Sequence, residues 1–599
     1  MKDGLNNTPM ICCPYFQVNR LFAVILILAV SLIAFGQKSK KTHKTNDDRV
    51  YLQHADNLRF DQYGMQAGAQ IAKGNVKFLH KGSILLCESA YFYQQSETFK
   101  AFGHVKMKQG DTLTLTSDYA WYDGGVGREM LYASKNVVLT HNKTVLHTDS
   151  LVYDKLYNFA YYLNNGKVND KGMELTSEWG EYHVDTKLAT FVFNVKLKDK
   201  DYNVVTDTLI YDAHTSKAHC KGPYTIVSGQ TTIQTNDGYF DNKTNWAQIY
   251  GPSTIISKSS TITTEKGEFN TKTEEAILHS RSKVVDNDRT IIADTLISND
   301  ETGINEGYGN VIYTDGRNKN TLFCGEFIYN KKEGHGYATA RPFDGDKLPL
   351  LKDYSQKDTL YVHGDTIRIE TFDIDTDSMY RKVHVYPHVR IYRKDVQAVA
   401  DSVCGNSQDS VMIIYKDPIV WHANQQLVGE EIHIYIADST IDRTHVIGQA
   451  FSIEALKRNA EEMKNSKAID HYNQISSSEM WSYFEKGKVK MSEAISNVLV
   501  DYYPFDEQDS TLMGMVYCET DTLRMYMTEG QLDHLWTCAN KGTMYPLNQI
   551  PADRHKLPNF ALFDYIRPID ENDLFEWRPK KAGTGIKNLK RSAPPKLKL

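Results

Sequence analysis

Apolar and polar residues alternate along most of this 599-residue chain. In Phe191-Val192-Phe193-Asn194-Val195-Lys196-Leu197-Lys198, one set of alternate positions holds Phe, Phe, Val and Leu, and the other is mostly polar. Val105-Lys106-Met107-Lys108 divides in the same way. Because successive side chains of a strand point to opposite faces, this pattern predicts β-strands with one dry and one wet face. We expect turns between such strands at Gly110-Asp111, Gly124-Gly125 and Asn164-Asn165-Gly166.

Two features of the sequence recur with the same period of about 29 residues. The first is a small turn followed by a β-branched or aromatic residue, and its copies end at Val76, Val105, Val137, Val168, Val195, Tyr224, Thr254, Val284 and Val311. The second is an acidic residue, at Glu88, Asp118, Asp149, Glu178, Asp207, Asp237, Glu265, Asp294 and Glu326, and again at Asp365, Asp401 and Glu430. A shared period indicates a repeat of two or three short strands, which must stack on its neighbours to bury its apolar face.

Interruptions of this pattern divide the chain. Two repeat blocks are expected at 46–340 and 358–455, with a linker at 341–357. The apolar spacing in 452–470 and 478–486 predicts a small helical insertion near 452–486. Residues 456–577 are therefore expected to hold this insertion, and they have room for a further β repeat. Residues 578–599 contain Lys and Arg without any acidic residue, which predicts a disordered basic tail.

The N-terminal region carries an export signal. Residues 21–36, LFAVILILAVSLIAFG, are almost wholly apolar, and Ala34 and Gly36 suit a cleavage site before Gln37. A signal peptide at 1–36 fits better than an uncleaved anchor, because the run is shorter than the roughly 20 residues of a membrane span. We therefore expect the chain to work outside the cytoplasm. Among the six later cysteines, only Cys518 and Cys538 are close enough in sequence to suggest a disulfide.

The repeated phrases resemble the OstA/LptA family of periplasmic lipopolysaccharide-transport proteins. That family combines a Ser/Ala-Asp-x-Ala-x-Tyr phrase with a Gly-Asn-Val phrase. The first is present as Ser117-Asp118-Tyr119-Ala120-Trp121-Tyr122, and loosely as Glu88-Ser89-Ala90-Tyr91. The second is intact at Gly74-Asn75-Val76 and Gly309-Asn310-Val311. The likeness covers most of residues 50 to 455, in a chain several times longer than a one-domain member.

The resemblance implies an all-β fold, a repeated antiparallel β-jelly-roll of two sheets arranged as an open V. It also implies a non-enzymatic carrier that holds the acyl chains of lipid A between the sheets as part of a periplasmic bridge to the outer membrane. The implied partners are lipopolysaccharide, the outer-membrane translocon, and other jelly-roll proteins joined by end-to-end strand pairing. The alternation identifies candidates for the lipid-facing wall: Val105, Met107, Phe191, Phe193, Val195 and Leu197. These residues could equally fill a closed core.

Other function classes receive less support from the sequence. An exported adhesin or glycan-binding β-solenoid without a lipid groove remains the alternative, with Tyr153, Tyr161 and Tyr162 as candidates for its aromatic platform. The acids recur in every repeat rather than in one cluster, so we expect them to stabilise turns rather than to catalyse. No motif for a catalytic centre, a metal or a cofactor was found. A formal net charge of −6 disfavours nucleic acid as a partner.

Overall fold

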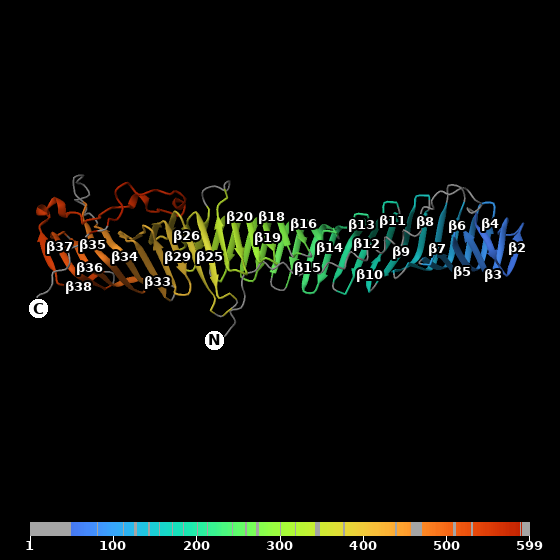
Figure 1. Cartoon of the computed structure of the whole chain (residues 1–599), viewed down its shortest axis with the longest axis horizontal. Coiled ribbons are helices and arrows are strands. Elements are labelled where there is room, and N and C mark those ends of the chain that lie inside the picture. The colour runs from blue at the N-terminus through green and yellow to red at the C-terminus, as the bar shows by residue number, and fades with distance from the viewer. Residues whose placement is uncertain are drawn as a thin grey trace. The chain divides into compact units, whose positions relative to one another are not determined.

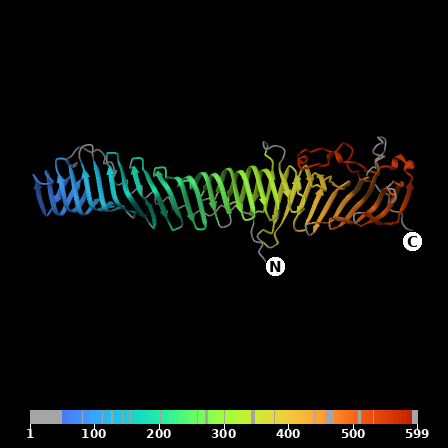
Figure 2. The same cartoon turned by 180° about the vertical axis from the view of Figure 1, so that it is seen from behind.

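We analysed a computed structural model of the chain (Figures 1 and 2). It describes residues 49–587 and 589 apart from internal gaps at 81, 112, 125–128, 142–143, 155, 171, 184, 201, 213, 242, 258–259, 271–272, 274, 300, 318, 342–347, 375, 377, 438–439, 457–469, 507–510 and 529–530. The predicted signal peptide and half of the predicted basic tail, 588 and 590–599, lie outside these residues. No helix in the described part of the chain is long and apolar enough to cross a membrane.

The described residues form an all-β structure, as predicted, and it contains a long antiparallel sheet. The chain divides into an N-terminal unit, residues 11–287 and 295–301, and a C-terminal unit that includes 288–294 and 302–599. The N-terminal strands are β1 (Tyr51–His54), β2 (Asn57–Asp61), β3 (Ala69–His80), β4 (Ser83–Tyr93), β5 (Thr98–Gln109), β6 (Leu113–Asp123), β7 (Met130–His141), β8 (Thr144–Asp154), β9 (Phe159–Asp170), β10 (Met173–Ser177), β11 (Trp179–His183), β12 (Leu188–Lys198), β13 (Asn203–Asp212), β14 (Lys217–Ser228), β15 (Thr231–Asp241), β16 (Trp246–Ile256), β17 (Ser260–Asn270) and β18 (Glu275–Asp286). Strand β19 (Arg289–Asn299) is shared between the units.

The C-terminal unit continues with shorter strands, then longer ones, and ends in irregular chain. Its strands are β20 (Ile304–Asp315), β21 (Asn320–Asn330), β22 (His335–Thr339), β23 (Leu350–Asp353), β24 (Leu360–His363), β25 (Thr366–Phe372), β26 (Tyr380–Tyr386), β27 (Val389–Tyr392), β28 (Val396–Ala400), β29 (Ser402–Asn406), β30 (Val411–Tyr415), β31 (Ile419–His422), β32 (Gln425–Val428), β33 (Glu431–Ala437), β34 (Thr440–Ala455), β35 (Tyr472–Glu485), β36 (Lys488–Tyr502), β37 (Met515–Thr528), β38 (Gln531–Cys538) and β39 (Lys541–Tyr545). The helical elements among the described residues are single 3-10 turns, η2 (Leu547–Gln549), η3 (Ala552–Arg554), η4 (Asp564–Ile566) and η5 (Asp573–Phe575).

In the N-terminal unit, most strands pair with the next strand in sequence (Figure 1). Alternate strands carry a bulge near their middle. The repeated Gly-Asn-Val phrase forms this bulge. In β5 the bulge is Gly103-His104, whose φ angles are 76° and 45°, and the register with β6 shifts between Phe102 and Val105. A two-residue bulge bends the strand, so each bulged strand has two halves that meet at a corner.

In most repeats the acidic residue lies opposite the bulge of a neighbouring strand. The Asn136 side-chain amide donates to Asp118 at 2.7 Å, and the Asn310 amide donates to Asp294 at 2.8 Å. A Cβ added to Gly103 would lie 2.3 Å from a carboxylate oxygen of Glu88. Bulge and acid therefore share one period because they contact each other. The acids pair mainly with side chains at the corner rather than capping a turn between strands.

A buried hydroxyl residue precedes the acid in several repeats and completes the corner from the inside. Thr264 donates to the carbonyls of Lys266 and His279, at 2.9 and 3.1 Å. Thr235 lies within 3.5 Å of the corresponding carbonyls of Asp237 and Tyr250. These bonds satisfy backbone oxygens that the bulge takes out of the sheet ladder.

The same corner divides the strands of the C-terminal unit into two ladders. The first ladder pairs β22, β25, β26, β29, β30, β33 and the first part of β34. The second pairs β23, β24, β27, β28, β31, β32 and the last part of β34. The ladders separate at an acid, such as Asp365, or at a left-handed pair such as Lys416-Asp417. The bent strands of the N-terminal unit and the split strands of the C-terminal unit are two forms of one repeat. The arrangement of two sheets as a V-shaped jelly-roll stays a prediction.

Residues 551–587, which we call the strap, pack on the outer face of the second ladder (Figure 2). Phe563 and Ile566 of the strap lie in one buried cluster with Ile419 and Trp421. The start of the predicted basic tail therefore belongs to the folded unit. Within it, Lys580 forms a 2.6 Å ion pair with Asp417.

Several local predictions differ from the structure. Residues 478–486, predicted as a helix, lie almost entirely in β35, and 452–455 end β34; residues 457–469 are outside the described part. The predicted linker 341–357 contains β23, which pairs with β21 and β24. Asn164-Asn165-Gly166 lies inside β9 rather than between strands. Cys518 and Cys538 are both free thiols, so the suggested disulfide is absent.

Candidate functional site

The two halves of the N-terminal strands enclose one apolar interior. On β7, Leu131 and Ala133 precede the bulge, while Val137 and Leu139 follow it, yet all four belong to one buried cluster. The cluster extends from Leu113 on β6 to Phe240 on β15. The outward positions between them are polar in many strands, which explains the alternation seen in the sequence.

Five of the six predicted wall residues lie in or against this interior. Val105, Phe191, Val195 and Leu197 are buried. Met107 is partly buried and packs against the cores on both sides of it. Strict alternation on each half-strand therefore identifies inward positions well, and lipid contact by these residues stays a prediction.

Phe193 is the exception, because 53% of its surface is exposed. It is the first bulge residue of β12, with a φ of 66°, and Asn194 follows at 52°. The two residues together oppose Asp207 on β13, so the register shifts between Val192 and Val195. Simple alternation would place Phe193 beside Phe191, but the bulge directs it outward.

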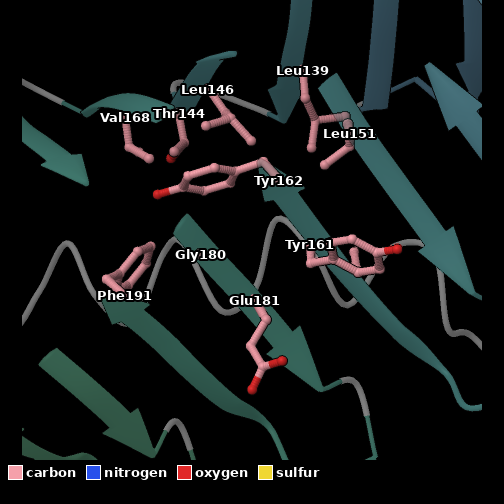
Figure 3. A pocket seen from close by; sticks show the side chains of 11 residues that line it. Leu139, Thr144, Leu146, Leu151, Tyr161, Tyr162, Val168, Gly180, Glu181 and Phe191 are labelled. Atoms are coloured by element: carbon pink, nitrogen blue, oxygen red, sulfur yellow. The ribbon is translucent and has the colours of Figure 1, made fainter. Parts of the chain in front are cut away.

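The interior is tightly packed around β8 to β12 (Figure 3). A small cavity of about 30 Å³ lies there, among the aromatic rings of Tyr162 and Phe191 and the aliphatic side chains of Leu146 and Val168. That volume accommodates one or two water molecules. An acyl chain is many times larger than this cavity.

Two tyrosines place polar atoms in this apolar interior. The Tyr162 hydroxyl bonds the Ser177 hydroxyl, and burial raises the pKa of Tyr162 to about 12 despite that bond. Tyr182 is fully buried, and its hydroxyl has no hydrogen-bond partner among the described residues. Burial also raises the pKa of Tyr182, so both phenols stay neutral donors at physiological pH. Of the three tyrosines considered for an outward platform, Tyr153 and Tyr162 are core residues.

The acids of the repeat do not assemble into a reactive cluster. Asp118, Glu178 and Asp294 each accept a hydrogen bond from the asparagine of the adjoining bulge. Among the residues that the structure describes, no group of three or more His, Cys, Asp or Glu could hold a metal ion. The corner is thus a site of structural pairing, as its regular spacing suggested.

A known protein family matches the N-terminal part of this repeated β-structure. The model of a family described as "OstA-like protein" matches residues 47–207 and 203–294. Residues 47–294 belong to the OstA-like family. The OstA-like match ends before most of the C-terminal unit, although the corner of the repeat recurs there, for example at Gly448-Gln449 and at Ser496-Asn497.

Individual proteins resemble this chain only weakly. No curated protein matches the chain. Among solved structures, the chain is similar to LptH from Pseudomonas aeruginosa, the LptA homologous periplasmic component of a lipopolysaccharide transport device. The identity is 14%, the match covers 21% of this chain and 82% of LptH, and the TM-score is 0.17.

The sequence did not identify Tyr182 or the buried hydroxyls of the corner. A signal for the hydroxyls exists, because Ser117, Ser177 and Thr264 each stand directly before an acid of the repeat. No such signal marks Tyr182, because a tyrosine at an inward strand position has the same pattern as any core aromatic residue.

Proposed function

We propose that this protein binds lipopolysaccharide in the periplasm and carries it toward the outer membrane, without a catalytic step. The observation that carries the proposal is the continuous apolar interior between the two halves of the N-terminal strands. Membership of residues 47–294 in the OstA-like family supports it, because that family resembles lipopolysaccharide carriers. Removing acyl chains from water stabilises them by about 0.8 kcal/mol for each buried CH₂ group, so such an interior suits a lipid with several chains.

Lipid entry in this proposal requires the two half-sheets to part. The corner can act as the hinge, since it is built from left-handed bulges such as Gly103-His104 and from the acids that cover them. The acyl chains would then replace the contacts that Phe191, Val195 and Leu197 now make with the opposite wall. The sugar part of the lipid would remain outside, in water.

Tyr182 supports an amphipathic rather than a purely hydrocarbon ligand. A buried hydroxyl without a partner is destabilising by about 1–3 kcal/mol. An ester or amide carbonyl near the acyl chains of a lipid could accept the hydrogen bond that Tyr182 lacks among the described residues. In this proposal the ligand thus satisfies a polar group that the closed interior leaves unpaired.

The N-terminal end of the interior suits end-to-end pairing with a similar β-protein. Strands β1 and β2 pair with β3 alone among the described strands. Leu58 lies opposite Ala72 of the buried core, yet 57% of Leu58 is exposed. An added strand would extend the ladder and cover this open end of the core. We propose a bridge protein or the outer-membrane translocon as the partner.

The second candidate is the exported scaffold without a lipid groove, because the interior around β8 to β12 contains a cavity of only about 30 Å³. The two candidates make different predictions for Phe191, which faces the interior, and Phe193, which faces out. They are the same residue type on one strand, so they form a matched pair.

Photocrosslinking in the producing cells separates the two candidates. A photoreactive amino acid is placed at position 191 or at position 193, and the adducts are blotted for lipopolysaccharide. Adducts at 191 and none at 193 are expected for a carrier. A folded, abundant protein with no adduct at 191 would indicate the scaffold, and equal adducts at both positions would indicate non-specific contact.

A further inference from the structure

Glutamine side chains of β32 and β35 hold the strap of the C-terminal unit by hydrogen bonds to its backbone. Gln474 on β35 donates to the carbonyl of His555 and accepts from the N–H of Leu557, both at 2.9 Å. Gln426 on β32 makes the same pair of bonds with Ala561 and Phe563, both at 2.8 Å. Each glutamine thus pairs with the strap as a neighbouring strand would, and the strap covers a face that is otherwise apolar.

A buried carboxylate lies beside the first of these glutamines. Asp501 on β36 pairs directly with Gln474 on one side and with Tyr517 of β37 on the other. Directly paired residues in antiparallel strands point to the same face. The strap contacts both neighbours, because Leu557 bonds Gln474 and the Arg554 guanidinium lies 4.4 Å from the centre of the Tyr517 ring. Asp501 is therefore covered by residues 554–557, and it is fully buried.

Neither carboxylate oxygen of Asp501 has a hydrogen-bond partner among the described residues. The titratable groups around it are Tyr517 on β37, Tyr503 and the adjacent ring of His471 beside β36, and Arg554 and His555 on the strap. Arg554 is the cation that acts on Asp501 electrostatically, but its guanidinium is engaged with Tyr517. An ionised Asp501 would thus be a buried charge without a bonded counter-ion, which is costly.

We propose that Asp501 is a proton-operated latch, which holds residues 551–562 of the strap on the outer face while it is neutral and releases them when it ionises. Release uncovers the apolar outer face formed by Phe451, Ile453 and Leu499. The far end of the strap is held independently by the ion pair between Arg390 and Asp573, at 3.1 Å. The latch therefore frees one section of the strap and leaves the section around Asp573 in place.

The direction of the pH effect follows from the burial of the carboxyl. Desolvation raises the pKa of Asp501 from 3.8 to about 7 in the closed strap, and Arg554 opposes this only in part. A group with a raised pKa in the closed form favours closure below that pKa, and the preference is lost as pH rises from about 4 to about 7. The closed strap is thus favoured in acid. Between pH 5.5 and pH 8.5 the closing equilibrium constant should fall by about 30-fold.

Hydrogen exchange of the full-length protein tests the latch. Protection of the Leu557 amide, after correction for the intrinsic effect of pH, should fall by about 30-fold between pH 5.5 and pH 8.5. The Ile569 amide, which bonds Asp573 at the far end of the strap, is the internal reference and should keep its protection.

Two variants separate the latch from general electrostatics. Asp501→Asn removes the titration and should make Leu557 protection independent of pH. Asp553→Asn, an exposed acid next to Arg554, should leave the wild-type profile intact. A pH-independent Leu557 in the wild type would overturn the proposal, and so would an undiminished effect in Asp501→Asn. If the asparagine variant does not fold, the wild-type profile still decides.

Discussion

The N-terminal and C-terminal units contain the same corner but differ in what covers their outer faces. In the N-terminal unit, lysines such as Lys106 and Lys196 point outward, beside inward Val105 and Val195. In the C-terminal unit, the outer face of the second ladder carries Ile419 and Trp421, which are buried beneath the strap. The same repeat therefore forms strands with one buried and one solvent-exposed face in the N-terminal unit, and strands that are buried on both faces in the C-terminal unit.

The difference shows where hydrophobic alternation stops being informative. In Val396-Gln397-Ala398-Val399-Ala400, all but the first residue are buried, because the strap covers one face and the interior covers the other. Strands buried on both faces lose the alternation of apolar and polar residues. The bulge and the acid still mark the corner there, at Asp401 and at Lys416-Asp417.

Truncation of Trp421 should produce the largest difference between the units. Trp421 is almost completely buried under Phe563 and Ile566, so Trp421→Ala should destabilise the C-terminal unit by about 3–5 kcal/mol. Urea unfolding followed by hydrogen exchange measures the two units separately. The N-terminal unit should keep its midpoint.

The control for Trp421 is Trp536, which is 46% exposed and contacts Arg524 on the outer surface. Trp536→Ala should destabilise the unit by about 1 kcal/mol or less. Equal losses in the two variants, or an equal loss in both units, would mean that the strap does not form a core with the second ladder.

Substitution of a corner glycine tests what the two units share. Gly103 and Gly448 have φ angles of 76° and 72°, and an added Cβ would lie 2.3 Å from Glu88 or 2.5 Å from Glu430. Gly→Ala at either position combines left-handed strain with a clash, so each unit should lose about 2 kcal/mol or more. Thermal unfolding of the two variants provides the comparison.

Shortening the acid separates the clash from the strain. In Gly103→Ala with Glu88→Ala, and in Gly448→Ala with Glu430→Ala, the clash with the carboxylate disappears, while the left-handed backbone and the close contact with the Cβ of the acid remain. Each pair should therefore show positive coupling in a double-mutant cycle. Coupling in one unit alone would contradict a common corner.

The sequence was sufficient to predict the β class and the contact-forming columns of the corner. Apolar and polar residues alternate on both sides of an interruption that recurs about every 29 residues. The bulge and the acid keep this period because they contact each other in the folded protein. It did not show that Gly-Asn is a bulge inside a strand, since left-handed residues also make turns between strands. For this reason the alternation predicts that Phe193 faces inward and that Asn164-Asn165-Gly166 is a turn, and the structure differs at both places.

The strap and the false helix have a different cause. In β35, Met480 faces the core, whereas Trp481 and Tyr483 lie on the outer face, where Trp481 stacks on His445 with ring centres 3.7 Å apart. Large apolar and aromatic residues on both faces produce the spacing of an amphipathic helix. The strap lies far along the chain from the glutamines that hold it, and no local pattern pairs Gln426 with Phe563.

The smallest of these effects should come from one glutamine of the strap contact. Gln426→Ala leaves the Phe563 N–H and the Ala561 carbonyl without their bonds, and costs about 1–2 kcal/mol because water can reach a loosened strap. Protection of the Phe563 amide should fall accordingly, while the interior of the N-terminal unit is unaffected. Gln408→Ala, at an exposed turn of the same unit, is the matched control and should leave Phe563 protection unchanged. If Gln426→Ala also left it unchanged, the strap would be held by its apolar side chains alone, and the glutamines would determine only its register.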